Sequence, residues 1–158
     1  MNPDWQAISS RLLAYPPRVH RLLPPCDEKR LEFIQKQLGK LPDPLVDMLH
    51  CFNGAKLFIR TAPLLSIFRI STVEPLPPLE WASDWCIDKF TPLWRRYGDR
   101  QNDWAIAMMN YGGLIILDSG CIVKEWDTSQ KMWNPGKLEF DKWIDKILAE
   151  GDAYMKEE

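Results

Sequence analysis

The chain has 158 residues, of which 46% are hydrophobic and 27% charged, with a net charge of −2. This size and balance match one globular domain with a real core, and the weak acidity argues against broad attraction to nucleic acid or anionic lipid. Residues 1–5 do not begin a signal peptide and no stretch approaches the ~20 apolar residues of a membrane span, so we expect a soluble, cytoplasmic protein.

The first third of the chain is predicted to be helical. Asn2 is expected to cap the first helix, which ends at Tyr15 because the residue before a proline is pushed out of helical conformation. A basic, proline-flanked connector follows at residues 16–25. Asn53 and Gly54 close the third helix, since both residues tolerate positive φ. The three predicted helices cover residues 3–14, 28–39 and 43–52.

Strands and turns dominate the middle of the chain. After a proline-rich loop at 74–78, we expect a helix over 81–90 and a short one over 91–97. Glycine-containing turns then separate three strands of an antiparallel meander. The predicted strands cover residues 55–60, 64–70, 104–109, 114–118 and 121–126.

An amphipathic helix over residues 138–150 closes the chain, and Gly151 is expected to mark its end. Helices first, strands next and a helix last predict an α+β fold: a central antiparallel sheet of five or six strands with helices packed on it. We interpret 1–158 as a single domain, in which residues 1–26 form an N-terminal helix and connector and residues 72–100 a tryptophan-rich insert.

Few residues suggest catalysis or a cofactor. The cysteines Cys26, Cys51, Cys86 and Cys121 lie far apart, and the two histidines are not spaced from them as zinc ligands are. His20 and His50 have no local signature of a nucleophile nearby. We expect reduced thiols, no catalytic residues, no metal and no cofactor, and hence not an enzyme.

Two short patterns in the insert leave alternatives open. Asp84 and Asp88 are four apart, so on a helix they would share a face and could hold a hard cation or work as acid and base, although such surfaces are more often solvated. Trp94, Arg95 and Arg96 interleave aromatic and basic groups, as nucleic-acid stacking sites do. The alternative is a short helix that buries its aromatics and turns its arginines to water.

Protein binding is the remaining class. Trp81 and Trp85 follow the proline-rich loop and form either an exposed aromatic patch or one face of a core helix. Tryptophan and arginine are residue types that dominate interface energetics. The candidate partner-binding residues are therefore Trp81, Asp84, Trp85, Asp88, Trp94, Arg95 and Arg96.

Three collinear segments, covering roughly residues 28–151, resemble the SUKH superfamily, which includes bacterial toxin-immunity proteins and a fungal cell-wall assembly regulator. The segments are Leu41-Pro42 with the helix ending in Phe52-Asn53-Gly54; Trp104-Ala105-Ile106-Ala107 through Gly112-Gly113, Ile116-Leu117-Asp118, Gly120, Val123 and Trp126; and Phe140-Asp141-Lys142-Trp143-Ile144.

The resemblance implies a non-enzymatic α+β domain with a concave sheet that binds protein. An immunity-type member would neutralise a toxin by occluding its active surface. The alternatives are a regulatory scaffold of the same fold without a toxin partner, or a weak nucleic-acid-binding module that uses Arg95 and Arg96. The resemblance leaves the partner and the oligomeric state open.

Overall fold

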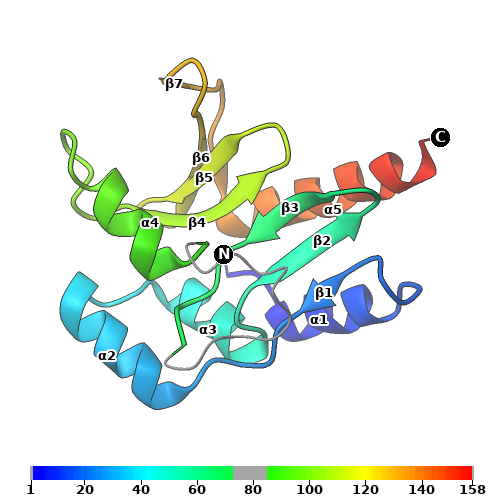
Figure 1. Cartoon of the computed structure of the whole chain (residues 1–158), viewed down its shortest axis with the longest axis horizontal. Coiled ribbons are helices and arrows are strands. Elements are labelled where there is room, and N and C mark those ends of the chain that lie inside the picture. Colours follow the sequence, from blue (N-terminus) through cyan, green and yellow to red (C-terminus); the bar gives the residue numbers. More distant parts are fainter. Residues whose placement is uncertain (1, 73–84, 158) are drawn as a thin grey trace.

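The structure is a computed structural model that describes residues 2–72 and 85–157 (Figure 1). Within these residues, five helices are present: α1 (Trp5–Leu13), α2 (Glu28–Leu38), α3 (Asp43–Cys51), α4 (Ile87–Trp94) and α5 (Phe140–Lys156). The same residues contain eight strands: β1 (Arg21–Leu22), β2 (Ala55–Ile59), β3 (Pro63–Ile67), β4 (Trp104–Met109), β5 (Gly113–Leu117), β6 (Ile122–Asp127), β7 (Met132–Trp133) and β8 (Leu138–Glu139).

All of these strands belong to one antiparallel sheet. Its order runs β1 to β7 in chain order, and β8 pairs with β6 beside β7. The α+β prediction with a central antiparallel sheet is therefore confirmed. The sheet has more strands than the five or six expected, because β1, β7 and β8 are two residues long and too short to show a period-2 pattern.

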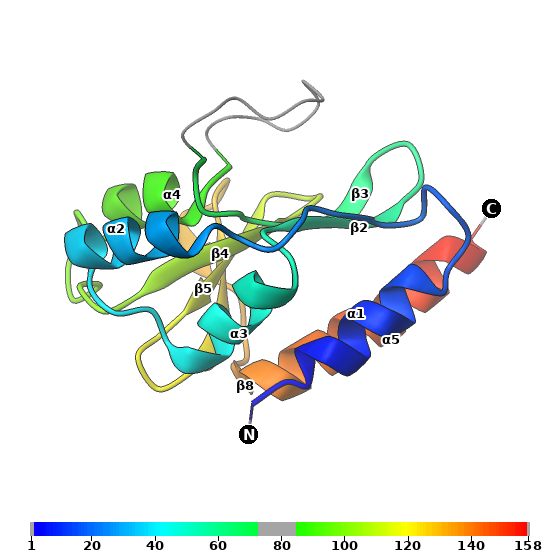
Figure 2. The same ribbon diagram turned by 90° about the horizontal axis from the view of Figure 1, so that it is seen from below.

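Helices lie on both sides of the sheet. Figure 2 shows α2 and α4 on one side and α1, α3 and α5 on the other. The buried apolar side chains form one continuous cluster, which includes Phe52, Phe58 and Phe68. Among the described residues, no helix is both long enough and apolar enough to cross a bilayer.

The helix predicted over 81–90 differs from the structure where the two can be compared. Residues 81–84 lie outside the described part of the chain, and Trp85 and Cys86 precede the helix, with Cys86 in a β-bridge to Arg69. α4 then runs continuously through Pro92, where a second helix was expected to begin. Buried side chains on both sides of this proline, Thr91 and Trp94, hold the helix in place by packing.

The start of α1 and the end of α5 also differ from the predictions. Asp4, not Asn2, caps α1, because its Oδ1 accepts a hydrogen bond of 3.1 Å from the Ala7 N–H. α5 does not end at Gly151 but continues to Lys156. Gly151 is instead a packing position, since a Cβ there would lie 2.1 Å from the ring of Phe58.

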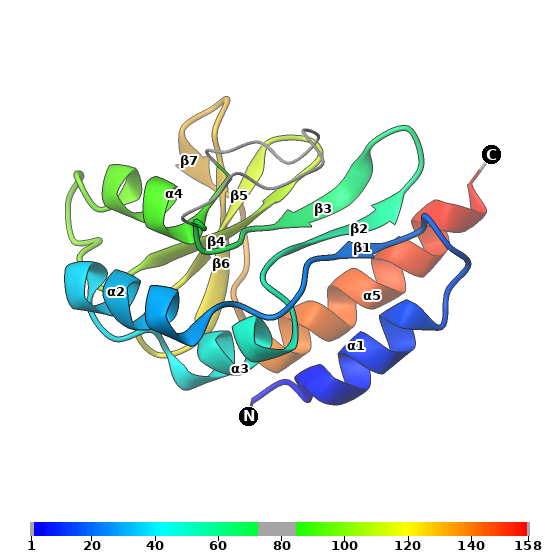
Figure 3. The same cartoon turned by 60° about the horizontal axis from the view of Figure 1, so that its bottom comes forward.

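α1 lies beside α5 (Figure 3), and side chains near the C-terminal ends of the two helices contact each other. The Arg11 guanidinium forms an ion pair of 2.9 Å with Asp152, and the Tyr15 hydroxyl donates to the same carboxylate. The imidazole of His20 packs edge-on against the rings of both Tyr15 and Phe58. His20 Nδ1 accepts a hydrogen bond of 3.1 Å from the Phe58 N–H.

This environment makes His20 a source of acid sensitivity. Burial lowers the pKa of His20 to about 4, outweighing the opposing charge of Asp152, while Arg11 lowers it further. The unfolded chain takes up this proton near pH 6.5 and the folded chain only near pH 4. The free energy of unfolding that depends on neutral His20 is therefore fully present above pH 6.5 and is lost as the pH falls from about 6.5 to about 4.

We expect this loss to amount to about 2 kcal/mol of unfolding free energy, after allowance for the partial exposure of His20. Urea denaturation at a series of pH values measures it. His20→Gln removes the titrating group and should flatten the curve by that amount relative to the parent. His50→Gln retains His20 and should keep the parent's dependence; equal slopes in all three proteins would contradict the assignment.

Candidate functional site: an aromatic cleft between α4 and the β6–β7 hairpin

Three tryptophans from separate elements meet at one corner of the sheet. Trp126 and Trp133 are opposite one another in the β6–β7 register, and Trp94 reaches them from α4. The three ring centroids are 5.2–5.4 Å apart in every pair, with the rings edge to face. Such edge-on pairs are the favoured aromatic geometry, so the trio forms a rigid apolar surface.

Two of the three, Trp94 and Trp126, line a cleft with a volume of about 590 Å³, which we call the aromatic cleft. Trp133 packs against both of them from beside the cleft. Leu114 is buried in it, whereas Tyr97 and Leu93 at its rim have 66% and 50% of their surface exposed. The residues that line the aromatic cleft are Phe90, Leu93, Trp94, Tyr97, Arg100, Leu114, Trp126, Thr128 and Lys131.

Cationic side chains lie over the rings of the trio. The Arg100 guanidinium carbon lies 3.8 Å from the ring centre of Trp94 and 4.8 Å from that of Trp126. Lys124 Nζ lies 4.8 Å from the ring centre of Trp133. Cations at these distances are attracted to the negative face of the indole. The aromatic cleft therefore presents apolar area and positive charge together.

The structure separates the three residues of the predicted stacking site. Trp94 is 6% exposed, and its indole N–H donates to the Asp103 carboxylate at 3.0 Å. Arg95 donates to the backbone carbonyls of Leu38 and Asp103 and lies over the ring of Trp104. Its hydrogen bonds thus tie α4 to the end of α2. Arg96 is exposed.

The remaining predicted residues do not gather in the aromatic cleft. Trp81 and Asp84 lie outside the described residues. Trp85 is 37% exposed and packs on Phe68, with Lys56 over its ring. The Asp88 carboxylate accepts hydrogen bonds from the backbone N–H and the hydroxyl of Ser71, so it positions the start of α4.

Sequence reasoning missed Trp126 and Trp133 as site residues. The feature of the sequence that could have revealed this pair is the turn between the two tryptophans. In that turn the side chain of Asp127 accepts hydrogen bonds from the backbone N–H groups of Ser129 and Gln130. An aspartate followed by polar residues is typical of a tight turn, and a turn there places the flanking tryptophans on paired strands.

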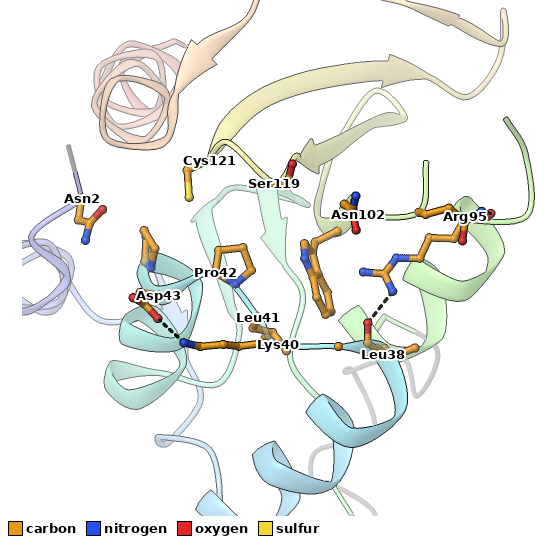
Figure 4. Close-up of a pocket in the computed structure, with 14 residues that line it drawn as sticks. Asn2, Leu38, Lys40, Leu41, Pro42, Asp43, Arg95, Asn102, Ser119 and Cys121 are labelled. Atoms are coloured by element: carbon orange, nitrogen blue, oxygen red, sulfur yellow. Dashed lines mark hydrogen bonds and ion pairs between the residues drawn. The ribbon is translucent and has the colours of Figure 1, made fainter. Parts of the chain in front are cut away.

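A second cleft, of about 490 Å³, lies at the start of α3 (Figure 4). Its charged side chains have partners: Arg95 donates to the Leu38 carbonyl, and Lys40 pairs with Asp43 at 3.8 Å. Burial raises the pKa of the Cys121 thiol, which keeps it in the weakly nucleophilic protonated form. Neither described histidine is among its lining residues. We therefore place the candidate site at the aromatic cleft.

Across residues 2–72 and 85–157, no group of three or more His, Cys, Asp or Glu side chains is placed to hold a metal ion. The four cysteines, all described, form no disulfide bond. Burial raises the pKa of Cys26 to about 11, so its thiol is protonated at neutral pH.

A comparison with protein-family models finds no match for the chain, and a comparison with curated proteins finds none either.

Proposed function

We propose that the protein is a non-enzymatic binding domain of the immunity type, which neutralises a toxin by binding it through the aromatic cleft. The observation that carries the proposal is the edge-to-face trio of Trp94, Trp126 and Trp133, of which Trp94 and Trp126 line an apolar cleft. The sequence resemblance to the SUKH superfamily supports the choice of an immunity-type partner.

The lining residues favour a protein as occupant. Aromatic and arginine side chains that surround a desolvated pocket are the residues that carry most binding energy at protein interfaces. Trp94 and Trp126 are already held by Arg100, so this wall needs little ordering when a partner docks. We infer that an apolar side chain of the partner enters the cleft.

Charge defines the rest of the partner surface. Arg100, Lys124 and Lys131 lie at or beside the cleft. Complementary charges speed association and suppress wrong partners. The partner surface that fits is therefore an apolar residue ringed by carboxylates.

The test is coexpression with each protein encoded by the neighbouring genes, followed by calorimetry on any purified pair. We expect one of these proteins to arrest growth alone and to bind this chain. Trp133→Ala should weaken binding about 30-fold, the equivalent of about 2 kcal/mol, without unfolding the protein because Trp133 is 38% exposed.

Two leucines provide a matched control. Leu93→Ala removes an exposed side chain at the rim of the cleft and should weaken the same complex, whereas Leu13→Ala removes an exposed side chain of α1 and should not. Neighbouring proteins that neither bind nor are neutralised would refute the immunity role. Binding that is unaffected by both Trp133→Ala and Leu93→Ala would refute the aromatic cleft as the interface.

A further inference from the structure

One cationic side chain that lines the aromatic cleft has no acceptor for its N–H groups. Arg100 is half-buried, with its guanidinium carbon 3.8 and 4.8 Å from the ring centres of Trp94 and Trp126. Through its side chain it forms no hydrogen bond or ion pair with residues 2–72 and 85–157, its exposed neighbour Asp99 included. The attraction between a cation and a ring needs no acceptor atom. The forked donors of Arg100 can therefore bind an anion without leaving the rings.

The acidic side chains near the cleft are engaged elsewhere. Among the described residues that line the cleft, none is acidic. The Asp103 carboxylate accepts from the indole N–H of Trp94 at 3.0 Å. The Asp127 carboxylate accepts from two backbone N–H groups of its own turn. An anion that neutralises Arg100 would therefore come from the molecule that enters the cleft.

Two further lining residues suit the backbone of a chain end. The Thr128 hydroxyl donates to the Gly112 carbonyl at 2.8 Å, so its oxygen is left to accept a hydrogen bond. A peptide N–H that becomes buried on binding requires such an acceptor. Lys131 lines the same cleft and adds a second positive charge. The lining thus combines an apolar wall, a guanidinium, an ammonium and an uncharged acceptor.

The position of Arg100 restricts where the anion can be attached. An oxygen bound to a guanidinium lies about 2.8 Å from its nitrogen, so the anion would sit beside the rings that line the cleft. In an extended chain, neighbouring side chains point to opposite sides, so an aspartate next to an apolar residue does not enter the same cleft. A C-terminal residue carries a carboxylate and a side chain on the same Cα, and both can enter together.

We propose that the aromatic cleft binds the C-terminal residue of its protein partner, with the apolar side chain against Trp94 and Trp126 and the α-carboxylate on Arg100. This inference rests on the proposed function, because it names the part of the partner that enters the cleft. The guanidinium fork matches the two oxygens of a carboxylate. A cleft of about 590 Å³ also has room for the residue that precedes the last one. Capture of a terminal carboxylate is a recurring mode of peptide recognition.

Calorimetric titration of the full chain with matched peptides tests the proposal. The probes are acetylated hexapeptides of glycine and serine that end in leucine, methionine, phenylalanine or tryptophan, each prepared as a free acid and as an amide. At least one free acid should bind at a single site with a Kd below about 1 mM. Its amide should bind about tenfold more weakly, because it offers the guanidinium no charged acceptor.

Arg100→Gln should weaken binding of the free acid about tenfold and leave binding of the amide unchanged, so that the two peptides bind alike. Unchanged binding of the amide also shows that the variant is folded. Arg96→Gln is the matched control, because Arg96 is exposed and does not line the cleft. This control should keep the parent's preference for the free acid.

The proposal is overturned if no free acid binds at about 1 mM, or if acid and amide bind the parent alike. Hydrocinnamate has the ring and carboxylate of a terminal phenylalanine without the peptide. If it binds as tightly as the phenylalanine peptide, the ligand is a small carboxylate and not a protein terminus.

Failure of this inference can be told from failure of the proposed function. A toxin complex that is weakened by Trp133→Ala and Leu93→Ala, but not by deletion of the toxin's last residue, keeps the aromatic cleft as the interface and refutes terminal recognition. Acid-selective peptide binding that is lost in Arg100→Gln, in a protein that binds none of its genomic neighbours, refutes the immunity role and supports terminal recognition.

Discussion

Gly151→Ala is expected to lower the free energy of unfolding by about 3 kcal/mol or more, although alanine is the better helix former. The added Cβ would lie 2.1–2.4 Å from three ring atoms of Phe58. The ring cannot move aside cheaply, because His20 and Tyr15 pack edge-on against it with centroids 4.6 and 5.9 Å away. Phe58 also has a positive φ of 54°, so its backbone is already strained.

Urea denaturation compares the variant with two controls. Gly120→Ala adds a Cβ at ordinary contact distance, 3.4 Å from Asp118 Oδ1, and should have little effect. Combining Gly151→Ala with Phe58→Leu should cost less than the sum of the two single changes, because the smaller side chain makes room for the Cβ. A stable Gly151→Ala protein, or strict additivity, would show that the contact is not a constraint.

Asn53→Ala is expected to destabilise the protein by about 3 kcal/mol. The buried side chain of Asn53 accepts from the Ile70 N–H at 2.8 Å and donates to the Ile70 carbonyl at 3.1 Å. Its amide thus takes the place of a strand partner for Ile70, beyond the paired residues of β2 and β3. Alanine would leave both Ile70 groups buried without a partner, and each would carry its own desolvation cost.

Asn110→Ala is the matched comparison, since Asn110 is exposed at a turn and should tolerate the change within about 0.5 kcal/mol. Hydrogen exchange adds a local measurement: the Ile70 amide should lose protection in Asn53→Ala more than the amides of β4 do. If Asn53→Ala is as stable as Asn110→Ala, the side chain does not supply the missing pairing.

Periodicity in the sequence predicts the elements that have a clear amphipathic pattern. α2, α3 and the strands β4, β5 and β6 lie within one residue of the expected ranges, because each buries one face or both. α5 was predicted as a helix, but it extends six residues beyond the expected end. The two-residue strands could not be predicted, since they form only where a longer strand provides the partners. Gly151 was misread because a glycine required by packing looks the same in sequence as a glycine that ends a helix.

The candidate site was predicted only in part. Trp94 was selected from its basic neighbours, yet its neighbours in space, Trp126 and Trp133, are 32 and 39 residues further along the chain. The arginine beside it in sequence, Arg95, binds backbone carbonyls, while Arg100 covers the rings. Local sequence indicates which residue types suit a binding surface, but the sheet register decides which of them meet.

The short strands at the ends of the sheet have a consequence for association between copies of the protein. Among the described residues, β1 and β7 are the outermost strands of the main path, and each is only two residues long. A strand of that length offers too few free N–H and carbonyl groups to template a row of intermolecular hydrogen bonds. The protein can therefore display an apolar, aromatic corner while its sheet margins resist the growth of fibrils.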